Sequence, residues 1–195
     1  MSWFKILVTL FWCFLIQGVA STVNVSDAGQ DSDGADIAFI ISTSGQTQLY
    51  YEKLFAKEVM VKLAQNSTKI RAAVVTFSGT YSASVKLNFT KKFNLQQFIS
   101  TINRIPYKYT RWISIGKALE ITSERVFRSS RQHVPKIAIL IVDYYDFYWS
   151  DNARVRIASE RVKQEGVRLV VVVLPPCFFL VNILKTRKNM SQKRL

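Results

Sequence analysis

The sequence contains few of the residues that cross-link small folds or build reactive centres. It has two cysteines, one histidine, four prolines and seven glycines. Cys13 lies in a segment that we expect to be removed, which leaves Cys177 without a partner for an internal disulfide. Cys177 is then either buried or available to bridge to another chain. This scarcity excludes a disulfide-stapled scaffold.

Motifs for nucleotide or nucleophilic chemistry are also missing. No Gly-X-Gly-X-X-Gly or phosphate loop follows an apolar segment, and there is no Gly-X-Ser-X-Gly elbow. The single histidine, His133, precedes an expected strand and should lie at the opposite end of a sheet from Ser44. Because a serine nucleophile needs a nearby base, we expect a protein that binds a partner and is not an enzyme.

The first 20 residues have the pattern of a secretory signal peptide. Lys5 is the only charged residue before Asp27, an apolar run covers Ile6–Ile16, and small residues around Ala20 suit cleavage. The run is too short to span a bilayer as a helix, and a membrane anchor is the alternative interpretation. We therefore expect a secreted, extracellular protein.

Positive charge exceeds negative charge about twofold. The chain has 27 Lys and Arg against 13 Asp and Glu, a formal net charge of +14. Outside the cell, such a charge attracts sulfated glycosaminoglycans or other anionic surfaces, whereas nucleic acid fits the charge but not the compartment. Simple solubility is the alternative. We expect any glycosaminoglycan binding to use the basic tail, Lys185–Arg194.

Asn-X-Ser/Thr triplets become candidate glycosylation sites behind a signal peptide, provided that they are exposed. Each triplet alone is weak, because such triplets arise by chance. The candidate asparagines are Asn24, Asn66, Asn88 and Asn189.

Continuous apolar runs rich in β-branched residues predict four buried strands. The runs are Ile37–Ile41, Ile70–Phe77, Ile137–Val142 and Leu169–Leu174. Continuous apolarity indicates burial on both faces, which is typical of a parallel sheet covered by helices. After a turn at residues 78–80, Val85, Leu87 and Phe89 alternate with polar residues and predict an antiparallel edge strand.

Helical spacing of apolar residues occupies the segments between these strands. A stretch at about residues 48–65 has an apolar stripe through Tyr51, Leu54, Phe55, Val59 and Leu63. Residues 115–126 and 155–162 predict two more helices, and Gly166 should end the second. The order β-α-β-β-α-α-β-α-β defines an α/β fold of three layers. Its doubly wound, mostly parallel sheet has one antiparallel edge strand and lacks its last strand and helix.

The chain divides into four expected segments. Residues 1–20 are the signal peptide, 21–35 a polar linker, 36–174 the domain, and 175–195 an apolar and then basic tail. Pro175 and Pro176 prevent a continuous helix from Leu169 to Leu184, which argues against a membrane span. A shortened product of a larger matrix protein and a small protein in its own right both fit this tail.

The ordered segments resemble the von Willebrand factor type A (VWA) domain. Asp36–Gln46 is similar to the family's first strand and Asp-X-Ser-X-Ser loop. Gly116–Leu119 resembles the start of the helix after its metal-binding threonine, and Val142-Asp143 its Thr-Asp pair. The resemblance implies an adhesion module like those of integrins, matrilins and collagens. Family members hold a divalent cation, usually magnesium, and a partner carboxylate often completes its coordination.

The residues that match this metal site depart from the family pattern. Ser42 stands in place of the first aspartate, Gln46 in place of the second serine, and Ile113 in place of the threonine, while Ser44 and Asp143 are retained. Magnesium needs octahedral oxygen ligands and gives up its water reluctantly. One carboxylate remains of two and Ile113 offers no oxygen, so we expect a degenerate adhesion site without magnesium or another cofactor.

Aromatic and basic residues crowd the loops that should lie at the carboxyl ends of the strands, where such sheets bind ligands. They are Tyr107, Tyr109, Arg111, Trp112, Tyr144, Tyr145, Phe147, Tyr148 and Trp149. Aromatic and arginine side chains are preferred anchors of protein interfaces, although the alternative is that several of them close the core. We expect this surface to bind an extracellular protein ligand, of matrix or collagen type.

Overall fold

The computed structural model describes residues 34–79, 82–108, 110, 112–143, 146 and 152–174. The expected signal peptide, nearly all of the linker and the tail lie outside the described residues, as do Cys13, Cys177, Asn24 and Asn189.

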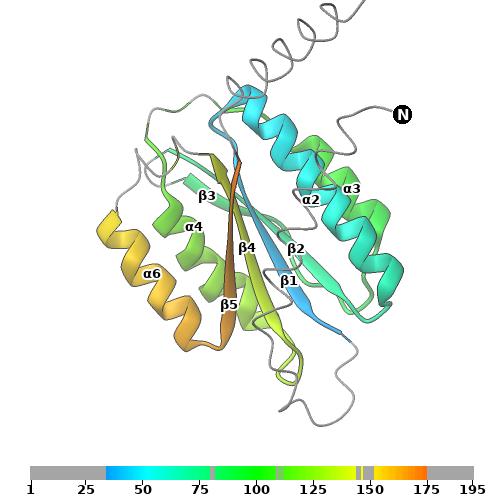
Figure 1. Cartoon of the computed structure of the whole chain (residues 1–195). Helices are drawn as coiled ribbons and strands as arrows, with labels where there is room; N and C mark the ends of the chain where they lie inside the picture. Colours follow the sequence, from blue (N-terminus) through cyan, green and yellow to red (C-terminus); the bar gives the residue numbers. More distant parts are fainter. Residues whose placement is uncertain are drawn as a thin grey trace, which may run out of the picture. The chain divides into compact units, whose positions relative to one another are not determined.

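The domain is built on one twisted sheet in the strand order β3-β2-β1-β4-β5 (Figure 1). The strands are β1 (Asp36–Ser42), β2 (Arg71–Ser78), β3 (Ser82–Leu87), β4 (Lys136–Asp143) and β5 (Val167–Leu174). β3 pairs antiparallel with β2, and the other pairings are parallel. The predicted α/β class with one antiparallel edge strand is therefore confirmed. β5 forms the other edge of the described sheet.

Helices cover both faces of the sheet and complete three layers (Figure 1). One face carries α2 (Gln46–Asn66) and α3 (Leu95–Arg104), and the other carries α4 (Ile115–Ile121) and α6 (Asn152–Gln164). α4 continues as a π-helical turn, Thr122–Val126, and a 3-10 turn, Phe127–Ser129. None of the described helices is long and apolar enough to cross a membrane.

The burial of the central strand β1 on both faces explains why its sequence is continuously apolar. Ala38 and Ile40 pack into the core beneath α4 and α6, while Ile37, Phe39 and Ile41 pack into the core beneath α2 and α3. Every residue of the strand is buried. β5 differs from this expectation, because only β4 flanks it and side chains such as Val171 and Val173 are exposed.

The buried stripe of α2 is not the one that apolar spacing predicted. Its fully buried residues are Leu49, Glu52, Ala56 and Met60. Phe55, Val59 and Leu63 of the predicted stripe flank that line and pack against the core while partly exposed. The helix is therefore rotated so that a carboxylate, Glu52, faces inward.

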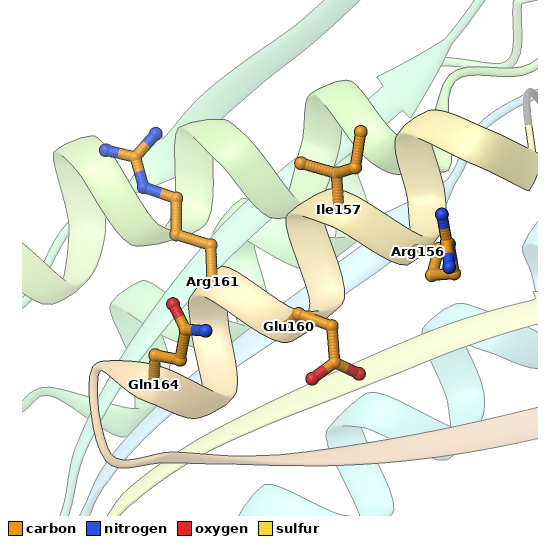
Figure 2. Close-up of a pocket in the computed structure, with 5 residues that line it drawn as sticks. All are labelled: Arg156, Ile157, Glu160, Arg161 and Gln164. Atoms are coloured by element: carbon orange, nitrogen blue, oxygen red, sulfur yellow. The ribbon is translucent and has the colours of Figure 1, made fainter.

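α6 matches its predicted pattern. Ala158 and Val162 are buried against the core, and Gly166 adopts a left-handed φ of 75° just after the helix ends. The outer face of α6 carries Ile157, which is 67% exposed. Figure 2 shows its neighbours on that face, Arg156, Glu160, Arg161 and Gln164.

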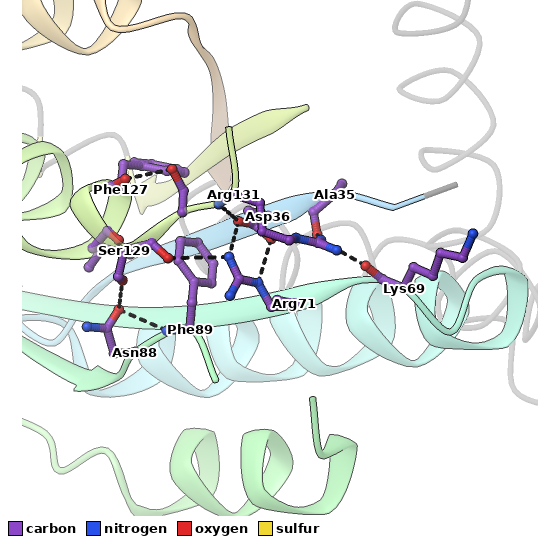
Figure 3. A network of polar contacts seen from close by, with 11 residues as sticks. Ala35, Asp36, Lys69, Arg71, Asn88, Phe89, Phe127, Ser129 and Arg131 are labelled. Atoms are coloured by element: carbon purple, nitrogen blue, oxygen red, sulfur yellow. Dashed lines mark hydrogen bonds and ion pairs between the residues drawn. The ribbon is translucent and has the colours of Figure 1, made fainter. Parts of the chain in front are cut away.

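A buried ion pair network joins the amino ends of β1 and β2 and the segment before β4 (Figure 3). Asp36, at the start of β1, accepts hydrogen bonds from Arg71 Nε (2.9 Å), Arg131 Nη2 (2.8 Å) and the Arg131 backbone N–H (2.7 Å). Burial alone would raise the pKa of Asp36, but the hydrogen bonds from Arg71 and Arg131 outweigh it and lower that pKa. The network fixes β2 and the segment before β4 to β1.

Candidate functional site

The carboxyl ends of β1 and β4 lie at the same edge of the sheet, and each ends in a buried polar residue. Ser42 ends β1 and Asp143 ends β4. The structure brings Ser42, Ser44 and Asp143 together, as predicted from the sequence. It does so through Asp146, a buried residue that the sequence pattern did not single out.

The carboxylate of Asp146 lies at the centre of this site. Its Oδ1 accepts hydrogen bonds from Ser42 Oγ (3.1 Å) and Ser44 Oγ (3.0 Å), and its Oδ2 accepts one from the Asp143 backbone N–H (3.1 Å). The backbone N–H of Asp146 donates to Asp143 Oδ1 (2.8 Å). The two serine hydroxyls also contact each other at 2.8 Å. Asp146 therefore ties the loop after β4 to the loop after β1.

A third carboxylate, Glu52, approaches the same site from α2. Glu52 is 1% exposed, and its Oε2 has no hydrogen-bond partner among the described residues. Burial raises its pKa well above the ordinary value, the charges of Asp146 and Asp143 add to the rise, and a hydrogen bond from the Ser42 backbone offsets part of it. The Glu52 side chain therefore points from α2 toward Ser42 and Asp146.

Asp146 also has a raised pKa, at about 6. Burial is the larger cause and the charge of Asp143 the next, while hydrogen bonds from the backbone of Asp143 and the two serines lower it in part. Of the two carboxylate positions in the family pattern only Asp143 is retained, but Asp146 and Glu52 bring two further carboxylates that the pattern did not predict.

Two sequence signals mark the residues that were missed. Asp146 follows Asp143 in an Asp-X-X-Asp spacing, in which each aspartate can accept a hydrogen bond from the other's backbone. Glu52 lies three residues after Leu49 and four before Ala56. That spacing places it on the inward line of an α-helix.

Ile113 and Gln46, the two other predicted members of the degenerate site, add no described oxygen ligand. Ile113 is buried in the core beneath α4, and its backbone forms an isolated bridge with Gly79. Gln46 begins α2, and its side chain lies outside the described part of the structure.

The donor set at this edge does not fit an octahedral magnesium ion. Both oxygens of Asp146 accept hydrogen bonds, Oδ1 of Asp143 does as well, and Ile113 is apolar. Among the described residues, no group of three or more His, Cys, Asp or Glu side chains is arranged to hold a metal ion. A magnesium ion there would compete with these internal hydrogen bonds for oxygen lone pairs and would also lose part of its own water shell. That the protein works without a cation stays a prediction.

Two of the predicted aromatic anchors are described, and both are exposed. Trp112 is 54% exposed and Tyr107 is 40% exposed. Their loop is held against the loop after β1, because the Lys108 backbone N–H donates to the Thr43 carbonyl at 2.9 Å. The other predicted anchors lie outside the described residues: Tyr109, Arg111, Tyr144, Tyr145, Phe147, Tyr148 and Trp149.

The positions of the remaining candidates follow from the fold. His133 is exposed in the turn that precedes β4, at the edge of the sheet opposite Ser44. Asn66 and Asn88 are both exposed, and Asn88 Oδ1 accepts a hydrogen bond from Ser129 Oγ at 3.1 Å. Glycosylation at either asparagine stays a prediction.

Sequence comparison places this fold and site in a known family. The family model of the von Willebrand factor type A domain matches residues 36–183. The chain belongs to the VWA family.

Individual relatives resemble the chain more distantly. Vitrin of Mus musculus is 25% identical over 156 residues, which cover 78% of this chain and 23% of vitrin. The chain therefore spans about a quarter of that relative's length.

Solved structures support the fold alone, since their sequence identities are low. Proximal thread matrix protein 1 from the mussel byssus has a TM-score of 0.61 and 23% identity, covering 72% of this chain and 36% of that one. BatB from Bacteroides thetaiotaomicron has a TM-score of 0.54 and 16% identity, covering 71% of this chain and 65% of BatB. Another structure of the mussel protein is described as having a zinc-occupied MIDAS motif.

Proposed function

We propose that this chain is an extracellular VWA adhesion module that binds a protein ligand by direct side-chain contact, without a divalent cation. The binding surface consists of the aromatic and basic side chains in the loops at residues 107–113 and 144–149. The site of Ser42, Ser44, Asp143 and Asp146 has a structural role and joins the loop after β1 to the loop after β4.

One observation carries this proposal. The carboxylate of Asp146 lies against the hydroxyls of Ser42 and Ser44, two positions where the family pattern places metal ligands. An acidic ligand approaching without a cation would meet the negative charge of Asp143 and Asp146. The exposed rings of Trp112 and Tyr107 offer a contact that needs no cation.

By analogy with proximal thread matrix protein 1 of the mussel byssus, whose fold this chain shares, we propose an extracellular matrix setting. A ligand of matrix or collagen type fits that setting. Glycosaminoglycan binding by the basic tail, Lys185–Arg194, also stays a prediction, because the tail lies outside the described residues.

The surroundings of the serines support binding over catalysis. Ser44 Oγ contacts Ser42 Oγ and Asp146, and the single histidine lies at the other edge of the sheet. A catalytic serine is usually activated by an adjacent base, and its hydroxyl oxygen must be accessible to the substrate. Ser42 and Asp146 are instead buried.

Replacing both Tyr107 and Trp112 with alanine should weaken ligand binding at least about tenfold, because exposed aromatic anchors contribute most of an interface's free energy. Binding is measured by biolayer interferometry, with fibroblast-deposited matrix and fibrillar collagen as probes. The matrix is first treated with heparinase to remove glycosaminoglycan chains. Thermal unfolding should change little, since about half of each side chain is solvent-exposed.

The matched control is Ile157→Ala, which removes an even more exposed apolar side chain from the outer face of α6. It should leave binding unchanged, and EDTA should leave wild-type binding unchanged. Equal binding by wild type and the Tyr107→Ala/Trp112→Ala variant would reject the proposed surface. Loss of wild-type binding in EDTA would reject the cation-free mechanism.

A further inference from the structure

Three separate segments meet at the amino ends of the strands, on the edge of the sheet opposite the candidate site. Arg131 Nη2 donates to the Lys69 carbonyl at 2.9 Å, and Arg71 Nη2 donates to the Ser129 carbonyl at 3.3 Å. Ser129 Oγ donates to Asn88 Oδ1 at 3.1 Å. Figure 3 shows these contacts. Residues 67–72, 86–92 and 125–136 therefore lie side by side.

These three segments contain no aspartate or glutamate. We name their cationic residues the basic edge: Lys69, Arg71, Lys86, Lys91, Lys92, Arg125, Arg128, Arg131 and Lys136. The concentration of one sign of charge on one edge of a domain produces a strong local positive potential.

Two described carboxylates near this edge, Asp36 and Glu124, already have cationic partners. Asp36 is completely buried, and its oxygens accept hydrogen bonds from Arg71 and Arg131. Glu124, which precedes the third segment, pairs with Arg161 of α6 at 2.8 Å. Positive charge of the basic edge is therefore exposed to the solvent at Lys91, Lys92 and Arg128.

The basic edge contains both arginines held in place by ion pairs and cationic side chains exposed to the solvent. Arg71 and Arg131 are half-buried and held in place by Asp36. Around them, Lys91, Lys92 and Arg128 are exposed. Fixed guanidinium groups lose little conformational freedom on binding an anion, and the exposed cations can follow charges along an extended ligand.

We infer that the basic edge binds sulfated glycosaminoglycan chains. A linear polymer with repeated sulfate and carboxylate groups can contact cations from all three segments at once, which a single small anion cannot. This surface differs from the tail favoured by the sequence, because it belongs to the folded domain. It also lies opposite the proposed ligand-binding loops, so the two activities are separable.

The test is heparin binding by surface plasmon resonance, using the full secreted chain at physiological salt. N-linked glycans are removed first, because Asn88 lies within the second segment. The variant Lys91→Ala/Lys92→Ala/Arg128→Ala should weaken heparin binding at least tenfold. These three residues make no described contact with Asp36, so the fold should be retained, as checked by thermal unfolding.

The matched control is Lys62→Ala/Arg156→Ala/Lys163→Ala, which removes the same charge from exposed positions on α2 and α6 (Arg156 is shown in Figure 2). It should weaken heparin binding less than twofold. Equal losses in the two triple variants would show non-specific attraction to net charge and would overturn the inference. The inference is equally overturned if deletion of residues 185–195 abolishes binding while the Lys91/Lys92/Arg128 variant binds like wild type.

Two further measurements separate this inference from alternatives. Anionic phosphatidylserine vesicles should compete poorly with heparin, and stronger binding to vesicles than to heparin would assign the surface to membranes instead. The Tyr107→Ala/Trp112→Ala variant should keep full heparin binding. If the Tyr107→Ala/Trp112→Ala test rejects the proposed adhesion surface, heparin binding by the basic edge is not affected. If the heparin test rejects the basic edge, the proposed adhesion surface is not affected.

Discussion

The variant Asp36→Ala is expected to lose about 3–5 kcal/mol of unfolding free energy, because removing one partner of a buried ion pair leaves the other uncompensated. Asp36 is completely buried and accepts hydrogen bonds from both Arg71 and Arg131. Without it, two guanidinium groups that are partly buried would face each other. Urea unfolding at neutral pH measures the change.

The control for this prediction is Glu124→Ala. Its ion pair with Arg161 joins two largely exposed side chains, and such pairs contribute about 0–1 kcal/mol. If Asp36→Ala and Glu124→Ala had similar small effects, the Asp36 network would not be what joins the amino ends of the strands.

The variant Glu52→Met is expected to raise the free energy of unfolding at neutral pH by about 1–3 kcal/mol, the usual cost of a buried polar atom without a partner. Glu52 is 1% exposed and its Oε2 has no partner among the described residues. Methionine has a similar length and no charge. The same substitution removes a carboxyl group whose ionised form is disfavoured by burial and by the charges of Asp146 and Asp143. Urea unfolding compares it with wild type, and Glu58→Met, at an exposed position of the same helix, is the control.

The same carboxylates should make the protein less stable as pH rises. The pKa of Asp146 is about 6 and that of Glu52 is also raised, so the folded state holds protons that the unfolded state has released. The stabilisation from these two carboxyl groups is complete at a pH below their pKa values in the unfolded state. It is lost as pH rises through their pKa values in the folded state. Wild type should therefore lose about 1 kcal/mol or more between about pH 5 and pH 7.5.

The double variant Glu52→Met/Asp146→Asn should lose most of this pH dependence. Asp36 and Glu120, whose pKa values are lowered, act in the opposite direction, and their contribution is lost only as pH falls through those lowered values. Urea unfolding across this range measures the slope. A wild-type stability that rises from about pH 5 to pH 7.5 would contradict the carboxylate cluster described for this site.

Long, uninterrupted apolar runs made the parallel strands predictable. The run Ile137–Val142 corresponds to β4, Lys136–Asp143, because a strand covered on both faces has no polar positions. The same reasoning failed for β5, since apolar composition does not tell an edge strand from a central one. Val171 and Val173 of β5, an edge strand of the described sheet, are exposed, whereas Val172 on its other face is buried.

The candidate site was predictable only for residues that end a strand or lie within two residues of its end, as Ser44 does. Ser42 and Asp143 end β1 and β4, so strand prediction alone places them at one edge. Asp146 reaches the site through a turn of the chain, and Glu52 reaches it because α2 is rotated relative to its apolar stripe. A search for apolar stripes assigns a glutamate to the outer face, and that assumption concealed the third carboxylate.

The most direct test of this account is calorimetric titration of the full chain with magnesium chloride at neutral pH. Because the oxygens of Asp146 and Oδ1 of Asp143 already accept internal hydrogen bonds, the account predicts no saturable heat up to millimolar magnesium. Saturable one-site binding that Asp143→Ala abolishes would contradict it.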